Sequence, residues 1–220
     1  MIISRGRRYV FVHIPKTGGT SLAQALEQRA MKDDILIGDT PKAVKRRKRA
    51  KALKGRGRLW KHSTLADIDG VLSIEELQSL TTFTLVRNPW DRIVSYYHWL
   101  REQSFDHAAV SLAKSLPFNQ FVLHPDIGRS FRLNPARHYM TRADGVEQCR
   151  FFIRLERFEE DASPLFDHLG FQINLPHLNR SARAKDYRRS YSDQTASVVA
   201  EICAEDVARF GFAFDPALGS

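Results

Sequence analysis

The stretch RYVFVHIPKTGGTSLAQAL, residues 8–26, predicts a short strand, a glycine turn and a helix, in that order. Residues 9–12 are aromatic and β-branched, as in a buried strand, and Pro15 ends that strand. From Leu22 onward, apolar residues recur at helical spacing. Because a helix that begins after a glycine turn presents free backbone N–H groups and the positive end of its dipole, this arrangement favours a bound phosphate or sulfate.

The turn itself, which we call the glycine loop, supplies one cation, two glycines and three hydroxyls. Its residues are Lys16, Thr17, Gly18, Gly19, Thr20 and Ser21. The glycines would let an anionic oxygen approach the backbone, because they carry no Cβ. The loop is not a Walker A motif, in which the lysine follows the glycines, since Lys16 precedes both. An ordinary strand–turn–helix corner with a solvated lysine is the alternative interpretation.

A second segment, TTFTLVRNPWDRIVSYYHWL (residues 81–100), predicts another strand followed by a helix. Residues 83–86 are typical of a buried strand, and Arg87 follows at the strand end, where open α/β sheets bind their ligands. Asn88 is a good N-cap and a proline comes next, so we expect a helix over residues 89–102.

Arg87 and Ser95 together predict a second anion site. The guanidinium offers a bidentate fork, and the hydroxyl, two helical turns further on, offers a directional donor, so the two can grip one phosphate. The alternative is that Arg87 pairs with an acid. For Asn88 and Asp91, helix capping alone explains the residue types.

The two segments resemble motifs of sulfotransferases that use 3′-phosphoadenosine 5′-phosphosulfate (PAPS). The glycine loop is similar to their 5′-phosphosulfate loop, and an Arg followed eight residues on by a Ser is similar to their 3′-phosphate motif. The resemblance continues over nearly the whole chain in KHSTLADIDG (61–70), TRADGVEQCRFFIRLERFEED (141–161), LPHLNRS (175–181) and EDVARFGF (205–212). These landmarks resemble the carbohydrate-type family, similar to the heparan 2-O- and chondroitin 4-O-sulfotransferases and their soluble bacterial relatives.

The resemblance implies how PAPS is held. Lys16 would stabilise the oxygen that bridges sulfur and phosphorus, and the rest of the glycine loop would hold the 5′ end. Arg87 and Ser95 would hold the 3′-phosphate. Arg180 and Ser181 lie in a late loop that would close over the nucleotide and add a contact to the 3′-phosphate. The late Arg-Lys-Gly triplet of the sulfotransferases with phenol and steroid acceptors is absent.

His62 is the predicted catalytic base. It stands in LWKHSTL, where related carbohydrate enzymes carry a histidine base between the two PAPS motifs, and a base with a pKa near 7 removes an alcohol proton best. A surface histidine beside Lys61 is the alternative. Glu156 resembles a family acid, and catalysis or pairing with a cation are both open for it. No metal is required, because Lys16, Arg87 and the helix N-terminus supply positive charge.

Length and composition favour a single domain, and the resemblance implies one sulfotransferase domain over residues 1–220. The chain is 43% hydrophobic, enough for one well-buried core. No apolar run approaches the ~18 residues of a membrane span, and the first residues are a poor signal peptide, so we expect a cytoplasmic, bacterial-type enzyme. Cys149 and Cys203 give neither a disulfide framework nor metal spacing.

The net charge of +9 is concentrated in one segment. Residues 42–58, the basic segment, carry ten Lys or Arg and no acid, while the remaining 24 basic residues face 25 acidic ones. A helix could begin at Pro41 and end at the glycines of residues 55–57. The basic segment could be a solvated face and a mobile insertion, a landing surface for an anionic glycan, or a nucleic-acid patch.

The coarse pattern predicts an α/β, P-loop-like three-layer fold with a central, largely parallel sheet flanked by helices. Strands are expected over residues 9–13, 35–37, 83–86 and 151–155, and helices over 21–31, 73–80, 89–102, 117–123, 159–169 and 193–210. Loops in residues 104–137 are expected to shape the acceptor pocket.

The predicted function is transfer of the sulfuryl group of PAPS, in line, to a hydroxyl of a carbohydrate or glycolipid acceptor, which could be anionic. Two alternatives belong to other classes. One is a P-loop kinase-like phosphotransferase, which the position of Lys16 and the Arg at residue 87 disfavour. The other is a non-catalytic polyanion or nucleic-acid binder acting through the basic segment, although aromatics for base stacking are absent there before Trp60.

Overall fold

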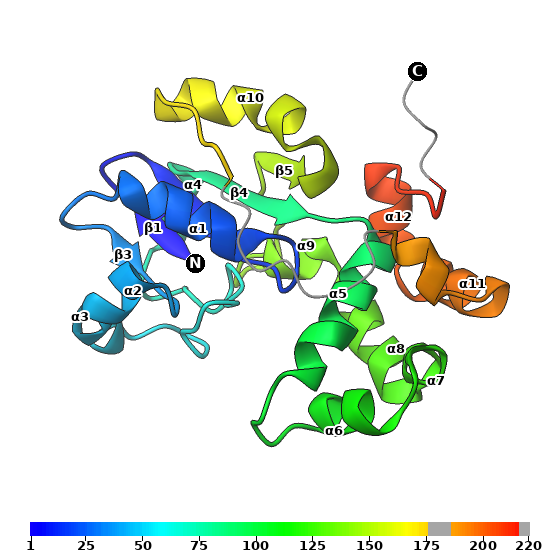
Figure 1. Cartoon of the computed structure of the whole chain (residues 1–220). Helices are drawn as coiled ribbons and strands as arrows, with labels where there is room; N and C mark the ends of the chain where they lie inside the picture. Colours follow the sequence, from blue (N-terminus) through cyan, green and yellow to red (C-terminus); the bar gives the residue numbers. More distant parts are fainter. Residues whose placement is uncertain (176–185, 216–220) are drawn as a thin grey trace. The chain divides into compact units, whose positions relative to one another are not determined.

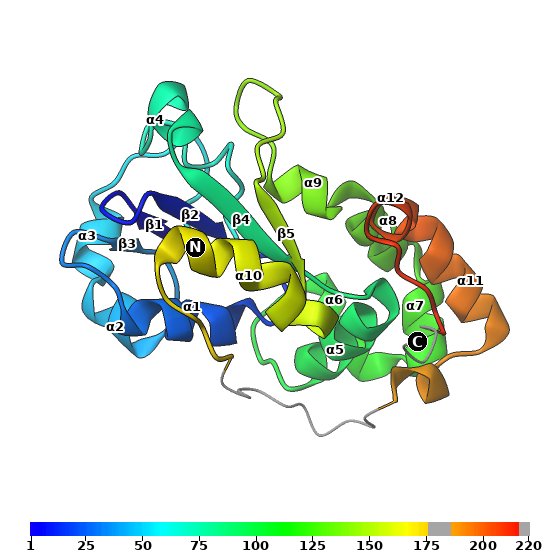
Figure 2. The same cartoon turned by 90° about the horizontal axis from the view of Figure 1, so that it is seen from above.

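The computed structural model describes residues 1–175 and 186–215. The chain divides into two compact units. The first, which we call the sheet unit, comprises Met1–Val86 and Ala136–Leu178. The second, the helical unit, comprises Arg87–Pro135 and Asn179–Ser220. Figure 1 and Figure 2 show the elements of each unit along the chain.

The sheet unit contains five strands in the order β3-β1-β2-β4-β5. They are β1 (Ile2–Ser4), β2 (Tyr9–Val12), β3 (Ile35–Leu36), β4 (Thr81–Val86) and β5 (Phe151–Arg154). β2 pairs with β4, and β4 with β5, in parallel, whereas β1 is antiparallel to both β2 and β3. Every described strand except β1 therefore runs in one direction, and the predicted α/β fold with a largely parallel sheet is confirmed.

The strand registers bring three loops to one edge of the sheet. Val12 of β2 aligns with Thr84 of β4, and Val86 of β4 aligns with Arg154 of β5. Because these strands are parallel, the segments that follow them all leave from the same side. We call this side the carboxyl edge; the glycine loop follows β2 there.

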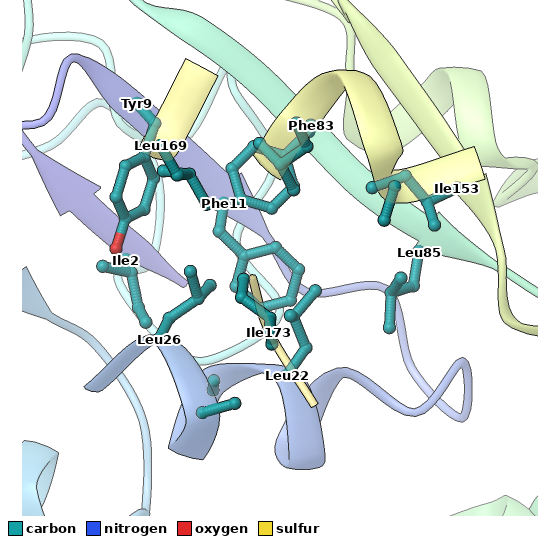
Figure 3. Close-up of a cluster of buried hydrophobic side chains, with 14 of the residues drawn as sticks. Ile2, Tyr9, Phe11, Leu22, Leu26, Phe83, Leu85, Ile153, Leu169 and Ile173 are labelled. Carbon is teal, nitrogen blue, oxygen red and sulfur yellow. The ribbon is translucent and has the colours of Figure 1, made fainter. Parts of the chain in front are cut away.

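Helices of the sheet unit are α1 (Gly19–Gln28), α2 (Pro41–Lys45), α3 (Arg47–Lys51), α4 (Ile74–Gln78), α9 (Ala136–Tyr139) and α10 (Phe158–Leu169), with a short 3₁₀ turn η1 (Leu155–Arg157). α1 and α10 pack on one face of the sheet. Figure 3 shows Phe11 and Phe83, whose ring centroids lie 5.4 Å apart, among Leu22 of α1 and Leu169 of α10. Val10 of β2, which points to the other face by strand alternation, is also fully buried.

The described part of the helical unit consists of helices and 3₁₀ turns. Its elements are α5 (Pro89–Arg101), α6 (Ala108–Ser115), α7 (Phe118–Leu123), α8 (Pro125–Leu133), η2 (Tyr187–Ser190), α11 (Asp193–Ile202) and α12 (Ala204–Phe210). Trp90, Tyr97, Phe121 and Val199 are buried together in its core.

Several predicted elements differ from the structure. Strand β1 was not predicted, and the helix expected over residues 193–210 is two helices that break at Cys203. The helix expected from Pro41 begins there, with the Thr40 side chain accepting a hydrogen bond from the Ala43 N–H, but it is interrupted at Arg46 and ends at Lys51.

Residues 104–137 contain the helix expected over residues 117–123, which is α7, and two helices that were not predicted, α6 and α8. α6 and α8 begin at caps that sequence reasoning does not anticipate, because the imidazoles of His107 and His124 accept hydrogen bonds from the N–H groups of Ala109 and Asp126. The usual cap residues are Ser, Thr, Asp and Asn. Residues 104–137 are therefore largely helical, and their contribution to an acceptor pocket stays a prediction.

Candidate functional site

The glycine loop leads directly from β2 into α1. α1 begins at Gly19, two residues before the predicted start, and Gly18 is its N-cap with a φ of 86°. No side chain caps this helix, and its first turn contains no acid. Backbone N–H groups at this end therefore face outward with the positive end of the dipole, as anion binding requires.

Packing alone already favours glycine at both positions of the loop. A Cβ on Gly19 would lie 2.1 Å from Cδ2 of His13, so no other residue fits without moving that ring. A Cβ on Gly18 would lie 2.9 Å from a methyl of Leu155, and the left-handed backbone of Gly18 already favours glycine. The loop is thus shaped by its contacts with β2 and with the turn after β5.

The polar side chains of the loop differ in their surroundings. Thr17 is fully buried, and its Oγ1 donates a hydrogen bond to the carbonyl of Ile14 at 2.9 Å, so its hydroxyl proton is already used. Ser21 is buried, Thr20 is half-buried, and Lys16 is half-buried with a left-handed φ of 66°. A left-handed lysine is uncommon and carries backbone strain.

His62, the predicted base, contacts the strand that feeds the glycine loop. Its Nδ1 lies 2.7 Å from the carbonyl oxygen of His13. A carbonyl only accepts, so Nδ1 must carry the proton, and Nε2 then holds the lone pair of a base. The two imidazole rings meet edge to face at 4.5 Å, and the ring of Trp60 contacts His62 at 5.0 Å.

Burial keeps both histidines of this pair uncharged. The pKa of His62 is lowered from its usual 6.5 to about 3, chiefly by burial, with the hydrogen bond to His13 acting in the opposite direction. Burial and the neighbouring His62 lower the pKa of His13 well below its usual value. His62 is therefore neutral at pH 7, as a proton acceptor must be, although its affinity for a proton is reduced.

In the helical unit, the Arg87–Ser95 segment begins α5 as the sequence predicts. The Asn88 side chain accepts a hydrogen bond from the Trp90 N–H and caps the helix. Nε of Arg87 donates to Oδ2 of Asp91 at 2.9 Å, so Arg87 does pair with an acid one turn along. Ser95 is buried.

Three further candidates have different outcomes. Arg180 and Ser181 lie outside the residues that the structure describes. Glu156 is exposed in η1, immediately after β5 at the carboxyl edge. Catalysis and pairing with a cation both stay predictions for this residue.

An open hollow of about 550 Å³ lies at the opposite edge of the sheet. It is lined by residues at the amino ends of β4 and β5, among them Thr81, Thr82 and Arg150. None of the predicted site residues contributes to it. We do not assign the hollow as the reactive centre, because the glycine loop lies at the carboxyl edge of the sheet and the hollow lies at the opposite edge.

Sequence reasoning missed two residues beside His62. Trp60 contacts the base, and the guanidinium of Arg58 lies over the Trp60 ring, 5.4 Å from its centroid. Their signal was the RLWKH string itself, which places a cation and an aromatic four and two residues before the histidine.

A strand, a glycine turn and an uncapped helix, set in a largely parallel sheet, define the class of α/β proteins that bind phosphate or sulfate groups. The family model described as the Sulfotransferase family matches residues 1–213, and the chain therefore belongs to the sulfotransferase family. The predicted resemblance to the heparan 2-O- and chondroitin 4-O-enzymes is confirmed by this match. So is the prediction of an enzyme that takes its sulfuryl group from PAPS.

Among solved structures, the chain is similar to a mouse sulfotransferase, SULT7A1, in complex with PAP. The identity is 15% and the TM-score 0.46, over 93% of this chain and 84% of the mouse chain. No curated protein matches the chain significantly. Over the described residues, no helix combines the length and apolarity that crossing a membrane demands.

Proposed function

We propose that the protein transfers the sulfuryl group of PAPS to a hydroxyl of a carbohydrate or glycolipid acceptor, with His62 as the base. The observation that carries this proposal is the hydrogen bond from His62 Nδ1 to the His13 carbonyl, because it leaves Nε2 with a lone pair next to the strand that feeds the glycine loop. The family model spans both compact units, which supports treating residues 1–213 as one catalytic domain.

The described donors suit the two anionic ends of PAPS, which supplies the sulfuryl group when bound. The uncapped N-terminus of α1 and the hydroxyls of Thr20 and Ser21 would hold the 5′-phosphosulfate. Arg87 and Ser95 would hold the 3′-phosphate, and Arg87 would have to exchange its partner Asp91 for that phosphate. Guanidinium groups and backbone N–H groups are the donors that such oxyanions prefer.

His62 and Lys16 would carry the chemistry. Nε2 of His62 would take the proton of the acceptor hydroxyl, while Nδ1 keeps its own proton on the His13 carbonyl. The ammonium of Lys16 would offset the negative charge that develops on the leaving oxygen. The positive end of α1 adds to that effect without moving, because its N–H groups are fixed by the helix.

The first test is calorimetry of 3′-phosphoadenosine 5′-phosphate (PAP) binding, compared with ATP and 5′-AMP. The wild type should prefer PAP, and Arg87→Ala should reduce PAP affinity roughly 10- to 100-fold, as loss of a charged hydrogen-bonding group does. Arg150→Ala, which removes an exposed arginine at the amino end of β5, is the matched control and should bind PAP normally. Equal binding of ATP and PAP would overturn the proposed donor.

Turnover then separates the two catalytic roles. Lys16→Ala and His62→Ala should each lower kcat by about a hundredfold or more. His62→Ala should leave PAP affinity unchanged, because His62 would act on the acceptor. Nearly full turnover in His62→Ala would show that another group is the base.

A further inference from the structure

Trp60 is an exposed aromatic residue in a firmly held turn beside the proposed base. It is 41% exposed, although its ring contacts His62. The backbone N–H of Trp60 donates to Oγ of Ser63 at 2.9 Å, and that hydroxyl in turn donates to the Arg58 carbonyl at 2.9 Å. Ser63 is fully buried. A buried serine with two hydrogen bonds thus fixes the turn that carries this large apolar ring at the surface.

The same turn is fixed at both of its ends by Asp67. The Gly57 N–H donates to the Asp67 carbonyl at 3.1 Å, and the Thr64 N–H donates to its carboxylate at 2.7 Å. A Cβ on Gly57 would collide with the Asp67 side chain, so the backbone at Gly57 packs against Asp67 with no space for a side chain. Because the turn is already ordered, its backbone loses little conformational entropy when a ligand binds to Trp60, and this favours recognition.

The adjoining basic segment carries more positive charge than nearby acids offset, since Glu27 interacts with only Lys42 and Arg46 of its ten cations. Across the described chain, none of its ten Lys and Arg side chains forms an ion pair with an acid. The neighbouring Lys61, by contrast, pairs with Asp39 at 2.6 Å. Some of the ten donate to backbone carbonyls, as Arg46 does to Met31 and Arg56 does to Ala143, which orders the segment without cancelling its charge. A positive field that acids offset only in part attracts a polyanion.

The combination points to one class of partner. A sugar ring has an apolar face of C–H groups that stacks on an indole, and a carboxylate or sulfate on that ring or the next pairs with a guanidinium. Arg58 lies over the Trp60 ring at 5.4 Å and so places the cation next to the platform. A single-stranded nucleic acid would instead need successive aromatic side chains, and residues 42–61 contain only Trp60.

Resting on the proposed function, we infer that Trp60, Arg58 and the basic segment form the acceptor-binding surface, and that the acceptor is an anionic carbohydrate. The sugar to be modified lies against Trp60, within reach of His62, and its acidic neighbours follow the basic segment. Trp60 and Arg58 then set specificity, whereas His62 sets the rate.

Binding and turnover are measured with three probes: an unsulfated chondroitin hexasaccharide, a neutral glucose hexasaccharide, and a single-stranded DNA of similar charge. The wild type should bind the chondroitin probe at least tenfold more tightly than the other two. Trp60→Ala should weaken that binding about tenfold, the effect of losing one aromatic contact, and Trp60→Phe should restore most of it. Arg58→Gln should weaken it and reduce its salt dependence.

Matched controls separate this surface from the rest of the protein. Val146→Ala trims another exposed apolar side chain, 50% exposed, and Arg150→Gln removes an exposed cation at the other edge of the sheet; neither should change acceptor binding. PAP affinity in Trp60→Ala and Arg58→Gln should equal that of the wild type. Lost PAP affinity would indicate a structural effect and would overturn the assignment.

Failure of this inference is distinct from failure of the proposed function. If PAP binds but the chondroitin probe binds no better than the neutral sugar or the DNA, the acceptor surface is wrong while the donor assignment stands. Unchanged acceptor binding in Trp60→Ala would have the same meaning. If PAP does not bind, the donor assignment fails, and selective, Trp60-dependent binding of the chondroitin probe would still support the surface.

Discussion

The two proposed anion sites, the glycine loop and the Arg87–Ser95 segment, differ in how much they must rearrange to bind. The loop offers backbone N–H groups at an uncapped helix end, fixed by the contact of Gly19 with His13. Arg87 offers a side chain that already has an acid partner, Asp91, within α5. The first arrangement needs no rearrangement to bind, whereas the second must exchange one ion pair for another. The first should therefore supply affinity at little cost, and the second should supply discrimination.

The largest effect is expected from breaking the prepared loop with Gly19→Ala. The new methyl would overlap the His13 ring and displace the carbonyl that orients His62, so unfolding free energy should fall by about 3 kcal/mol and PAP binding should be lost. Urea unfolding and calorimetry measure the two. Gly128→Ala is the control, since its Cβ would meet only Ile202 at 3.7 Å, and a helical Gly-to-Ala change stabilises by up to about 1 kcal/mol. Wild-type stability in Gly19→Ala would contradict this account of the loop.

The buried histidine pair predicts a loss of stability in acid. Because the pKa of His62 is about 3 in the folded protein and 6.5 otherwise, the unfolded chain binds more protons between these values. Stability should therefore fall as the pH falls from about 6.5 toward 3, by about 2 kcal/mol for this residue after allowance for its partial exposure. His62→Gln should flatten the dependence of the urea midpoint on pH. Parallel slopes in the wild type and the variant would refute the assignment.

Releasing Arg87 from its partner should sharpen the comparison. Asp91→Asn removes the competing carboxylate, so PAP affinity should rise roughly three- to tenfold while 5′-AMP affinity stays the same. Calorimetry with both nucleotides measures this. Asp193→Asn removes the first-turn acid of α11 and controls for the general loss of a helix-dipole partner. A fall in PAP affinity in Asp91→Asn would mean that Asp91 orients Arg87 for its ligand instead of competing with it.

The smallest effect is expected at Thr17. Thr17→Val keeps the shape but removes the donor to the Ile14 carbonyl, which should cost about 1 kcal/mol of stability. Thr17→Ser keeps the hydroxyl and should retain the hydrogen bond. Equal losses in the two variants, measured by thermal unfolding, would show that the methyl and not the hydrogen bond holds this part of the loop.

The centre of the sheet was predictable because its strands are long enough to show their pattern. β1 was not predicted, and this strand is defined by its pairing, with Ile2 opposite both Phe11 and Leu36. The helices α6 and α8 were missed for a different reason, because His107 and His124 act as their caps. Short elements and unusual caps depend on tertiary contacts that local sequence does not display.

The same distinction, between features that the local sequence displays and features that depend on tertiary contacts, applies to the site. Residue types and spacing were enough to single out the glycine loop, because its chemistry is local, whereas His62 was predicted only through the resemblance to carbohydrate sulfotransferases. That Gly19 is required by His13, and that the His13 carbonyl fixes the tautomer of His62, depends on a fold that brings residues 13 and 62 together. The pair of Arg87 and Asp91 lies at the four-residue spacing of helical ion pairs, so this partner could have been read from the sequence.

The left-handed backbone of Lys16 sets an evolutionary trade-off. Glycine would relax that conformation and stabilise the fold by about 1 kcal/mol, but it would remove the only ammonium group in the loop. Asparagine or aspartate would tolerate the geometry without supplying positive charge. Stability and the proposed role of Lys16 in sulfuryl transfer therefore favour different amino acids at this one position.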